Sequence, residues 1–324
     1  MLRYLTLRLA LTLPTLLLAS LVVFGVLRVL PGDIVHVILG ASGEGIIDPV
    51  QAERIREHLG LNAPLHQQYL SWLLSLVDGT FGGRSLDSHQ PVGALIGSQI
   101  PVTFLLTVYA LAFAVLVFVP LGAQAALHRG RWPDTLLRAL AVAGQAIPSL
   151  LLALGLLLGL ALLFRWSPPL IYTRLTEDPL RHIQVMLLPA LALGWGLGAQ
   201  LLRMTRSSLL DVLGQDYIRT ARSKGLPPSI TLWRHAMRNA LISVTSLAGV
   251  QAGALLGGVV VLEAVFGLPG IGRGLVQAVA TRDYPVVQTT AFLLVVIALL
   301  LNLALDILHG YIDPRIAQGR APDA

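Results

Sequence analysis

A run of basic side chains between two long apolar segments is the feature of this sequence best suited to specific recognition. Residues 216–240 read DYIRTARSKGLPPSITLWRHAMRNA, and Asp216 is the one acid among them. Guanidinium and ammonium groups at this density can bind an acidic protein surface or the negative end of a helix dipole. They cannot lie in hydrocarbon. The alternative interpretation is a solvated, positively charged loop without a partner.

The local signals within this stretch predict a helix, a turn and a second helix. Arg222 and Lys224 favour the last turn of a helix, and Gly225 can adopt the left-handed conformation just beyond it. Pro227 and Pro228 suit the first turn of a following helix, where a missing N–H costs least. We therefore expect a short helix that ends at a positive φ at Gly225.

The composition places the chain in a membrane. Of its 324 residues 55% are hydrophobic and 12% are charged, and the mean hydropathy is +0.74. Soluble domains carry about 25% charged residues. Apolar runs of spanning length predict helices, because the strands of a membrane barrel would alternate in polarity. The net charge of +6 reflects basic loops on one side of a membrane, and we expect no nucleic-acid partner.

The expected fold is all-α and polytopic, with six transmembrane helices. The predicted spans are 9–30, 102–127, 136–164, 183–202, 241–265 and 286–308. The predicted organisation is an N-terminal region with an uncleaved first span (1–30), an outer loop region (31–100), a core transmembrane domain (101–312) that contains a polar inner loop (211–240), and a tail (313–324).

The basic residues predict the orientation. With both termini in the cytoplasm, the inner set is Arg3, Arg8, Arg129, Arg131, Arg138, Arg203, Arg206, Arg219, Arg222, Lys224, Arg234, Arg238, Arg315 and Arg320. The short outer loops hold a smaller set, which is Arg165, Arg174, Arg181, Arg273 and Arg282. This imbalance agrees with the positive-inside rule.

Motifs for covalent chemistry are missing from the sequence. It has no phosphate-binding loop, no His-Glu-x-x-His, no Gly-x-Ser-x-Gly and no cysteine. The eight histidines fall in loops or at span ends, which argues against a metal site within the membrane. Glu263 and Asp306 are expected near span ends where water reaches them, so no deep proton relay is predicted. We expect neither an enzyme nor a bound cofactor or metal.

A few polar and small residues within the spans are candidates for a substrate pathway. These are Gln145, Pro148, Gly194, Ser246, Gln251, Gly253 and Gly257. Helix packing is an equally open interpretation, above all for the pattern Gly253-x-x-x-Gly257.

Two sequence blocks in the basic stretch resemble a known family. The letters Asp216-Tyr217-x-Arg219-Thr220-Ala221-Arg222-x-Lys224-Gly225-Leu226, followed by His235-Ala236-x-Arg238-Asn239, are similar to the ATPase-coupling loop of ABC importer permeases, closest to the dipeptide/oligopeptide/nickel branch. Gly83-Arg84-Ser85-Leu86, Arg282-Asp283-Tyr284-Pro285 and Asp313-Pro314-Arg315 also resemble that branch, so the likeness covers nearly the whole chain.

The resemblance implies a type I importer permease in the bacterial inner membrane, whose 216–230 loop docks in a groove of a cytoplasmic ATPase. It implies four further partners or sets of partners: a second, related permease in a heterodimer, two ABC ATPase chains that carry ATP-Mg, an extracytoplasmic substrate-binding protein, and a peptide substrate. Nickel and glutathione are the alternatives within the family. An ion-coupled secondary transporter is the alternative from another class.

Overall fold

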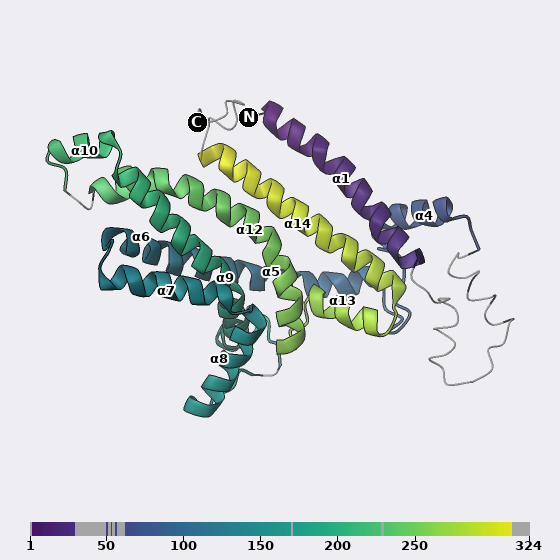
Figure 1. Cartoon of the computed structure of the whole chain (residues 1–324). Coiled ribbons are helices and arrows are strands. Elements are labelled where there is room, and N and C mark those ends of the chain that lie inside the picture. Colours follow the sequence, from purple (N-terminus) through teal and green to yellow (C-terminus); the bar gives the residue numbers. More distant parts are fainter. Residues whose placement is uncertain are drawn as a thin grey trace. The chain divides into compact units, whose positions relative to one another are not determined.

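The computed structural model of the chain is predominantly helical in the residues that it describes, which are 2–29, 50, 53, 56, 62–169, 171–227 and 230–312 (Figure 1). Within those residues, extended backbone pairs at one isolated bridge, between Arg84 and Pro91. The helices are α1 (Leu2–Val29), α4 (Leu65–Val77), α5 (Val92–Phe113), the π-helical η1 (Ala114–Phe118), α6 (Val119–Leu127), α7 (Trp132–Ala146), α8 (Ser149–Phe164), α9 (Pro179–Leu213), α10 (Asp216–Ser223), the π-helical η2 (Thr231–Ala236), α12 (Met237–Phe266), α13 (Ile271–Ala280) and α14 (Tyr284–Ile312).

Helices long and apolar enough to cross a membrane confirm the polytopic all-α class. Among the described residues four helical stretches qualify: Ala10–Arg28, Val92–Leu127, Pro179–Leu213 and Tyr284–Ala304. Two bent pairs of helical segments raise the number of spans to six if each pair is one span. The first pair is α7 with α8. The second is Thr231–Gln251 with Gly253–Phe266, which together comprise η2 and α12. Counted in this way, the spans agree with the six that the sequence predicts.

The predicted span 136–164 is interrupted within its length. It is divided between α7 and α8, which meet at 108°. Ile147 adopts φ −90° and ψ 119°, and Pro148 follows with φ −56° and ψ 140°. A proline disfavours the helical conformation in the residue before it and has no N–H for the helix ladder, so the chain turns here.

The chain divides into two compact units, of which the first comprises Met1–Arg8, Thr103–Leu268 and Ala298–Ala324. Its central helix is α9, which packs against α6, α7, α8 and α12. Small residues of α9 also allow close approaches to α5 and η1. Gly194 lies against the backbone of Ala110, and Gly198 lies against the ring of Phe118. Asp178 caps α9, because its carboxylate accepts a hydrogen bond from the N–H of Arg181 at 3.0 Å.

The second unit comprises Leu9–Val102 and Pro269–Ile297. Phe24 of α1, Trp72 of α4 and Phe292 of α14 form an aromatic cluster in it. Along the chain, the segment between α12 and α14 contains a short helix, α13.

Two sequence motifs far apart in the chain meet in this second unit. The hydroxyl of Ser85 donates to Oδ2 of Asp283 at 2.5 Å, and the same oxygen lies 3.4 Å from the backbone N of Asp87. The carbonyl of Phe81 accepts from the hydroxyl of Thr289 at 2.9 Å. These bonds hold the segment that follows α4 against the start of α14.

The contact between α6 and α9 gives a test of the first unit. A Cβ on Gly122 would lie 2.6 Å from the carbonyl oxygen of Leu202 and 2.8 Å from Cβ of Thr205, so we expect Gly122→Ala to destabilise the protein by about 1–3 kcal/mol. Gly159→Ala is the matched control, since a Cβ on Gly159 has nothing within 4 Å. Thermal unfolding in detergent measures both. Equal unfolding midpoints for the two variants would contradict the described packing.

Candidate functional site

Helix α10 and the turn after it have the local structure that the sequence predicts. The helix ends at Ser223, and Gly225 has φ +78°, which confirms the expected positive φ. The N–H of Lys224 donates to the carbonyl of Thr220 at 3.1 Å, and that of Gly225 donates to Arg222 at 2.9 Å. These bonds satisfy the last carbonyls of the helix. Of the two expected prolines, Pro228 lies outside the described residues.

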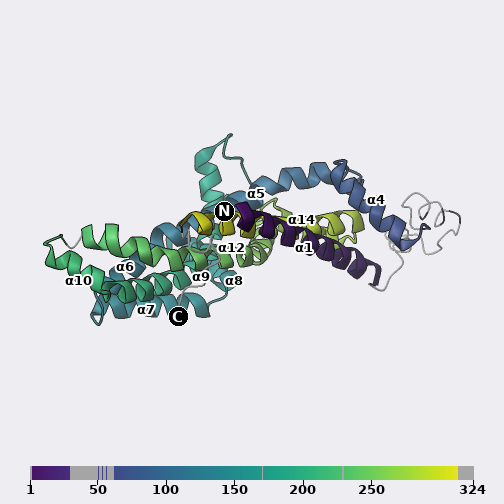
Figure 2. The same ribbon diagram turned by 90° about the horizontal axis from the view of Figure 1, so that it is seen from above.

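One face of α10 is buried in the first unit. Ile218 has an exposed fraction of 0%, and Ala221 is buried beside it on the same face. Ile218 packs in an apolar cluster with residues of four other elements: Ala123 and Ala126 of α6, Leu209 of α9, Leu232 and Ala236 of η2, and Met237 and Ala240 of α12. Figure 2 shows α10 at the end of α9. A movement of α10 must therefore displace at least one of these elements or open the cluster.

The other face of α10 is exposed and basic. Asp216, Tyr217, Arg219, Thr220, Arg222 and Lys224 are all exposed. Arg219 pairs with Asp216 at 3.7 Å, with side-chain exposures of 80% and 95%. A pair so exposed contributes at most about 1 kcal/mol, so it does not prevent Arg219 from binding elsewhere. This face can bind a complementary surface without any change in the buried face.

One of the remaining predicted site residues, Asn239, contacts α10 directly. Nδ2 of Asn239 donates to the hydroxyl of Tyr217 at 2.7 Å, which links the start of α12 to α10. Arg238 is exposed, whereas Leu226 and His235 are half-buried. The structure thus brings the two sequence blocks of the basic stretch together.

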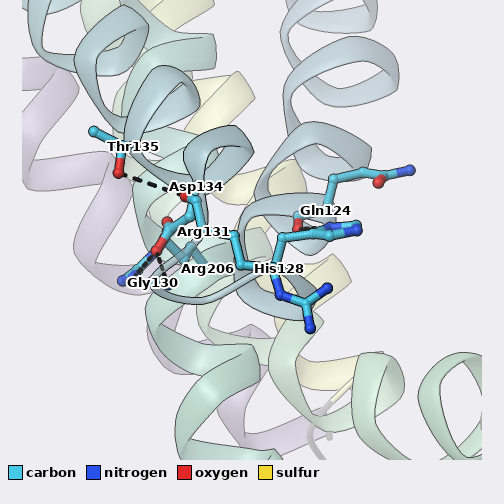
Figure 3. Close-up of polar contacts among 7 residues, drawn as sticks. All are labelled: Gln124, His128, Gly130, Arg131, Asp134, Thr135 and Arg206. Carbon is cyan, nitrogen blue, oxygen red and sulfur yellow. Dashed lines mark hydrogen bonds and ion pairs between the residues drawn. The ribbon is translucent and has the colours of Figure 1, made fainter.

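A buried ion pair at the start of α7 is a feature that sequence reasoning missed. Nε of Arg206 lies 2.6 Å from Oδ1 of Asp134, and Nη2 lies 2.8 Å from Oδ2 (Figure 3). The N–H of Gly130 also donates to Oδ2, at 3.0 Å. The side chains of Asp134 and Arg206 are only 2% and 20% exposed. Removing one partner of such a buried pair costs about 3–5 kcal/mol, because the other charge stays buried.

The sequence contains only a weak indication of this ion pair. Asp134 falls in the first turn of α7, where an acid also stabilises the helix dipole. Its partner is on α9, so nothing in the local sequence identifies it. The structure ties the turn between α6 and α7 to α9 through this one carboxylate.

The pathway candidates do not form one site. Gln145 and Pro148 are exposed at the bend between α7 and α8, and Gly194 is a packing residue, as described above. Ser246 is half-buried. Nε2 of Gln251 donates to Oε1 of Gln200 at 2.5 Å, which joins α12 to α9.

The Gly253-x-x-x-Gly257 pattern does not mark one close contact. A Cβ on Gly253 would lie 3.3 Å from Oδ1 of Asn302, but a Cβ on Gly257 would have nothing within 4 Å. Its neighbour Gly258 makes the close approach to α9, where a Cβ would lie 2.8 Å from Leu193. Within the described part of this chain Gly257 thus makes no close helix contact, and its role stays a prediction.

The expectation that water reaches Glu263 is also wrong. Its exposed fraction is 0%, and Oε1 accepts a hydrogen bond from the hydroxyl of Thr103 at 2.6 Å. The reason is that the end of α12 lies beside α5. The side chain of Asp306 lies outside the described residues. His182, at the start of α9, is fully buried and hydrogen-bonded to Tyr109 and to the carbonyl of Thr173.

Comparison with known proteins identifies the family. Residues 118–318 match the binding-protein-dependent transport system inner membrane component, and residues 1–107 match the N-terminal component of the same kind of protein. The chain belongs to this family. It is therefore a permease of a binding-protein-dependent ABC importer in the inner membrane, and the recognition from sequence is confirmed.

Among its relatives are the glutathione transport system permease proteins GsiC of Escherichia coli and of Salmonella typhimurium. Each is 38% identical over 316 residues, which is 98% of this chain and 99% of the relative.

Solved structures agree with the fold of this permease. The inward-facing MetNI methionine ABC transporter matches with a TM-score of 0.55 at 18% identity, over 69% of this chain and 99% of that one. An amino acid ABC transporter solved with histidines matches with a TM-score of 0.52 at 16% identity, over 67% and 94%. At these identities the likeness concerns the fold.

The attachment of α10 can be tested directly by proteolysis. Ile218→Ala should cost about 2–5 kcal/mol of local packing. A loss of 2 kcal/mol in local packing raises the fraction of molecules in which α10 is locally unfolded roughly 30-fold. We expect trypsin to cleave after Arg219 and Arg222 faster by a similar factor in the purified permease. Thr220→Ala, on the exposed face, is the matched control. Equal cleavage rates in the two variants would show that Ile218 does not hold the helix.

Proposed function

We propose that α10 is the element through which separate ATPase chains drive this permease. The observation that carries the proposal is the division of α10 into a buried face and an exposed basic face. A groove on the ATPase that is acidic, or that presents helix carbonyl ends, complements Arg219, Arg222 and Lys224. The buried face, through Ile218, then transmits the displacement to α6, α9 and α12.

We also propose a complex around this chain, and membership of its family supports the kinds of partner in it. The permease pairs with a related permease in a heterodimer, and two ATPase chains bind ATP-Mg and hydrolyse it. A substrate-binding protein delivers the substrate from outside, as the family description indicates. Both termini and α10 face the cytoplasm, and this chain catalyses no covalent step.

The substrate class that we propose is short peptides, with glutathione among them. Two observations support it: relatives at 38% identity are glutathione transport permeases, and glutathione is itself a tripeptide. The chain also offers amide and hydroxyl groups in its helices, such as Gln200, Gln251 and Ser246, that suit a peptide better than a bare metal ion. Nickel, bare or chelated, is the alternative.

The coupling role predicts the effect of a change at Gly225. A β-branched residue at φ +78° costs about 1–2 kcal/mol or more, and a Cβ at this position meets no atom within 4 Å. Gly225→Val should therefore leave the permease inserted and assembled but abolish the stimulation of ATP hydrolysis by the loaded binding protein. The measurement is ATPase activity of the reconstituted complex with and without that protein.

Two control variants separate backbone strain from other effects. Gly225→Asn should retain most of the stimulation, because asparagine tolerates a positive φ. Gly214→Ala should do so too, because Gly214 has φ −81°. Normal stimulation in Gly225→Val would refute the coupling role. Transport by the permease without any ATPase would instead favour an ion-coupled carrier.

The substrate proposal is tested by uptake in a strain that lacks this gene. We expect loss of labelled glutathione or labelled di- and oligopeptide uptake, with nickel accumulation unchanged. Restoring the gene should restore uptake. Loss of nickel accumulation with intact peptide and glutathione uptake would overturn the peptide assignment.

A further inference from the structure

The carboxylate of Asp134 joins three parts of the first unit. It belongs to the first turn of α7, it accepts the N–H of Gly130 in the turn after α6, and it binds the guanidinium of Arg206 on α9 by two contacts (Figure 3). Arg206 lies two helical turns before Leu213, where α9 ends and the chain leads into α10. The pair therefore lies where α6, α7 and the end of α9 meet.

The described residues also show apolar contacts of α7 with α9. Ala141 packs in a cluster with Phe118, Ala199 and Leu202, and Gly144 lies against the ring of Trp195. Much of the rest of α7 is exposed, including Leu136, Leu140 and Val142. Apolar contacts tolerate small sliding movements between helices, whereas a planar, two-point guanidinium–carboxylate contact fixes both distance and orientation. Among the described contacts, the ion pair is the one that fixes the register of α7 on α9.

We infer that Asp134 and Arg206 are positioning residues that make α7 move with α9 and α10, so that the pair sets how much ATP hydrolysis is coupled to transport. The inference rests on the proposed function of α10. Displacement of α10 reaches α9 and α6 through the cluster around Ile218. The ion pair then carries the movement into α7, whose other end is the bend that leads to α8.

Arg206→Lys is the first test variant, because it keeps the positive charge but loses the two-point contact. Arg203→Lys is its matched control, since Arg203 is exposed on the same helix three residues earlier. In the reconstituted complex we expect Arg206→Lys to assemble and to hydrolyse ATP normally without the binding protein. The stimulation by the loaded binding protein should fall at least about five-fold, and Arg203→Lys should not change it.

A distance measurement tests the same inference without a transported substrate. The chain contains no cysteine, so spin labels at Ser223→Cys on α10 and Leu136→Cys on α7 report one distance. We expect a narrow distribution that stays the same when the ATPases are trapped with ATP and vanadate. In Arg206→Lys the distribution should broaden or shift on trapping.

The outcomes separate this inference from the proposed function. Normal stimulation and an unchanged distance distribution in Arg206→Lys, while Gly225→Val is uncoupled, would overturn the inference alone. Normal stimulation in Gly225→Val would overturn the proposed function. If Arg206→Lys does not assemble, Asp134→Asn repeats the test with the shape of the side chain retained. Failure of both variants to assemble would show that the pair serves stability and would also refute the inference.

Discussion

A peptide group in hydrocarbon has no water to bind, so a spanning segment must satisfy its own backbone hydrogen bonds. This constraint makes the spans of the permease helical and forces polar segments out of them. The basic stretch after α9 is the clearest case, because its exposed face carries Arg219, Arg222 and Lys224. The burial of Ile218 keeps this polar segment packed against α6, α9 and α12. Attachment on one face and exposure on the other suit α10 to the coupling role that we propose for it.

Two kinds of contact between helices stabilise the first unit. Small residues allow helices to approach closely where lipid removes most of the hydrophobic driving force, as Gly122 of α6 does against α9 and Gly144 of α7 does against the ring of Trp195. Polar pairs fix the register of one helix on another. These pairs are Gln251 with Gln200, Thr103 with Glu263, and Asp134 with Arg206. The polar pairs are costly to break in this environment, so they fix which residue of one helix faces which residue of the next.

The sequence could predict what depends on local chemistry. The apolar runs predict the spans, and the turn chemistry at Gly225 predicts its positive φ, which the structure confirms. The bend at Ile147 and Pro148 could also have been predicted, because a proline disfavours the helical conformation in the residue before it. The long apolar run on both sides of the proline favoured one span instead.

What depended on distant parts of the chain could not be predicted. Asp134 pairs with Arg206 of α9, which is 72 residues away in the chain, and Ser85 hydrogen-bonds to Asp283, which is 198 residues away. The burial of Glu263 depends on the neighbouring α5, which a hydropathy pattern does not place. The choice between packing and pathway at Gly253, Gly257 and Gly258 likewise depends on which helix lies opposite each residue.

Cross-linking from α10 tests the central claim most directly. A cysteine introduced at Ser223, which is exposed on α10, carries a photoactivatable cross-linker in an otherwise cysteine-free chain. A cysteine at Ser88, in the segment between α4 and α5, is the control. Our account predicts that illumination of the complex in membranes joins Ser223→Cys to an ATPase chain and leaves Ser88→Cys without that product. Cross-linking of the ATPase from Ser88→Cys but not from Ser223→Cys would contradict it.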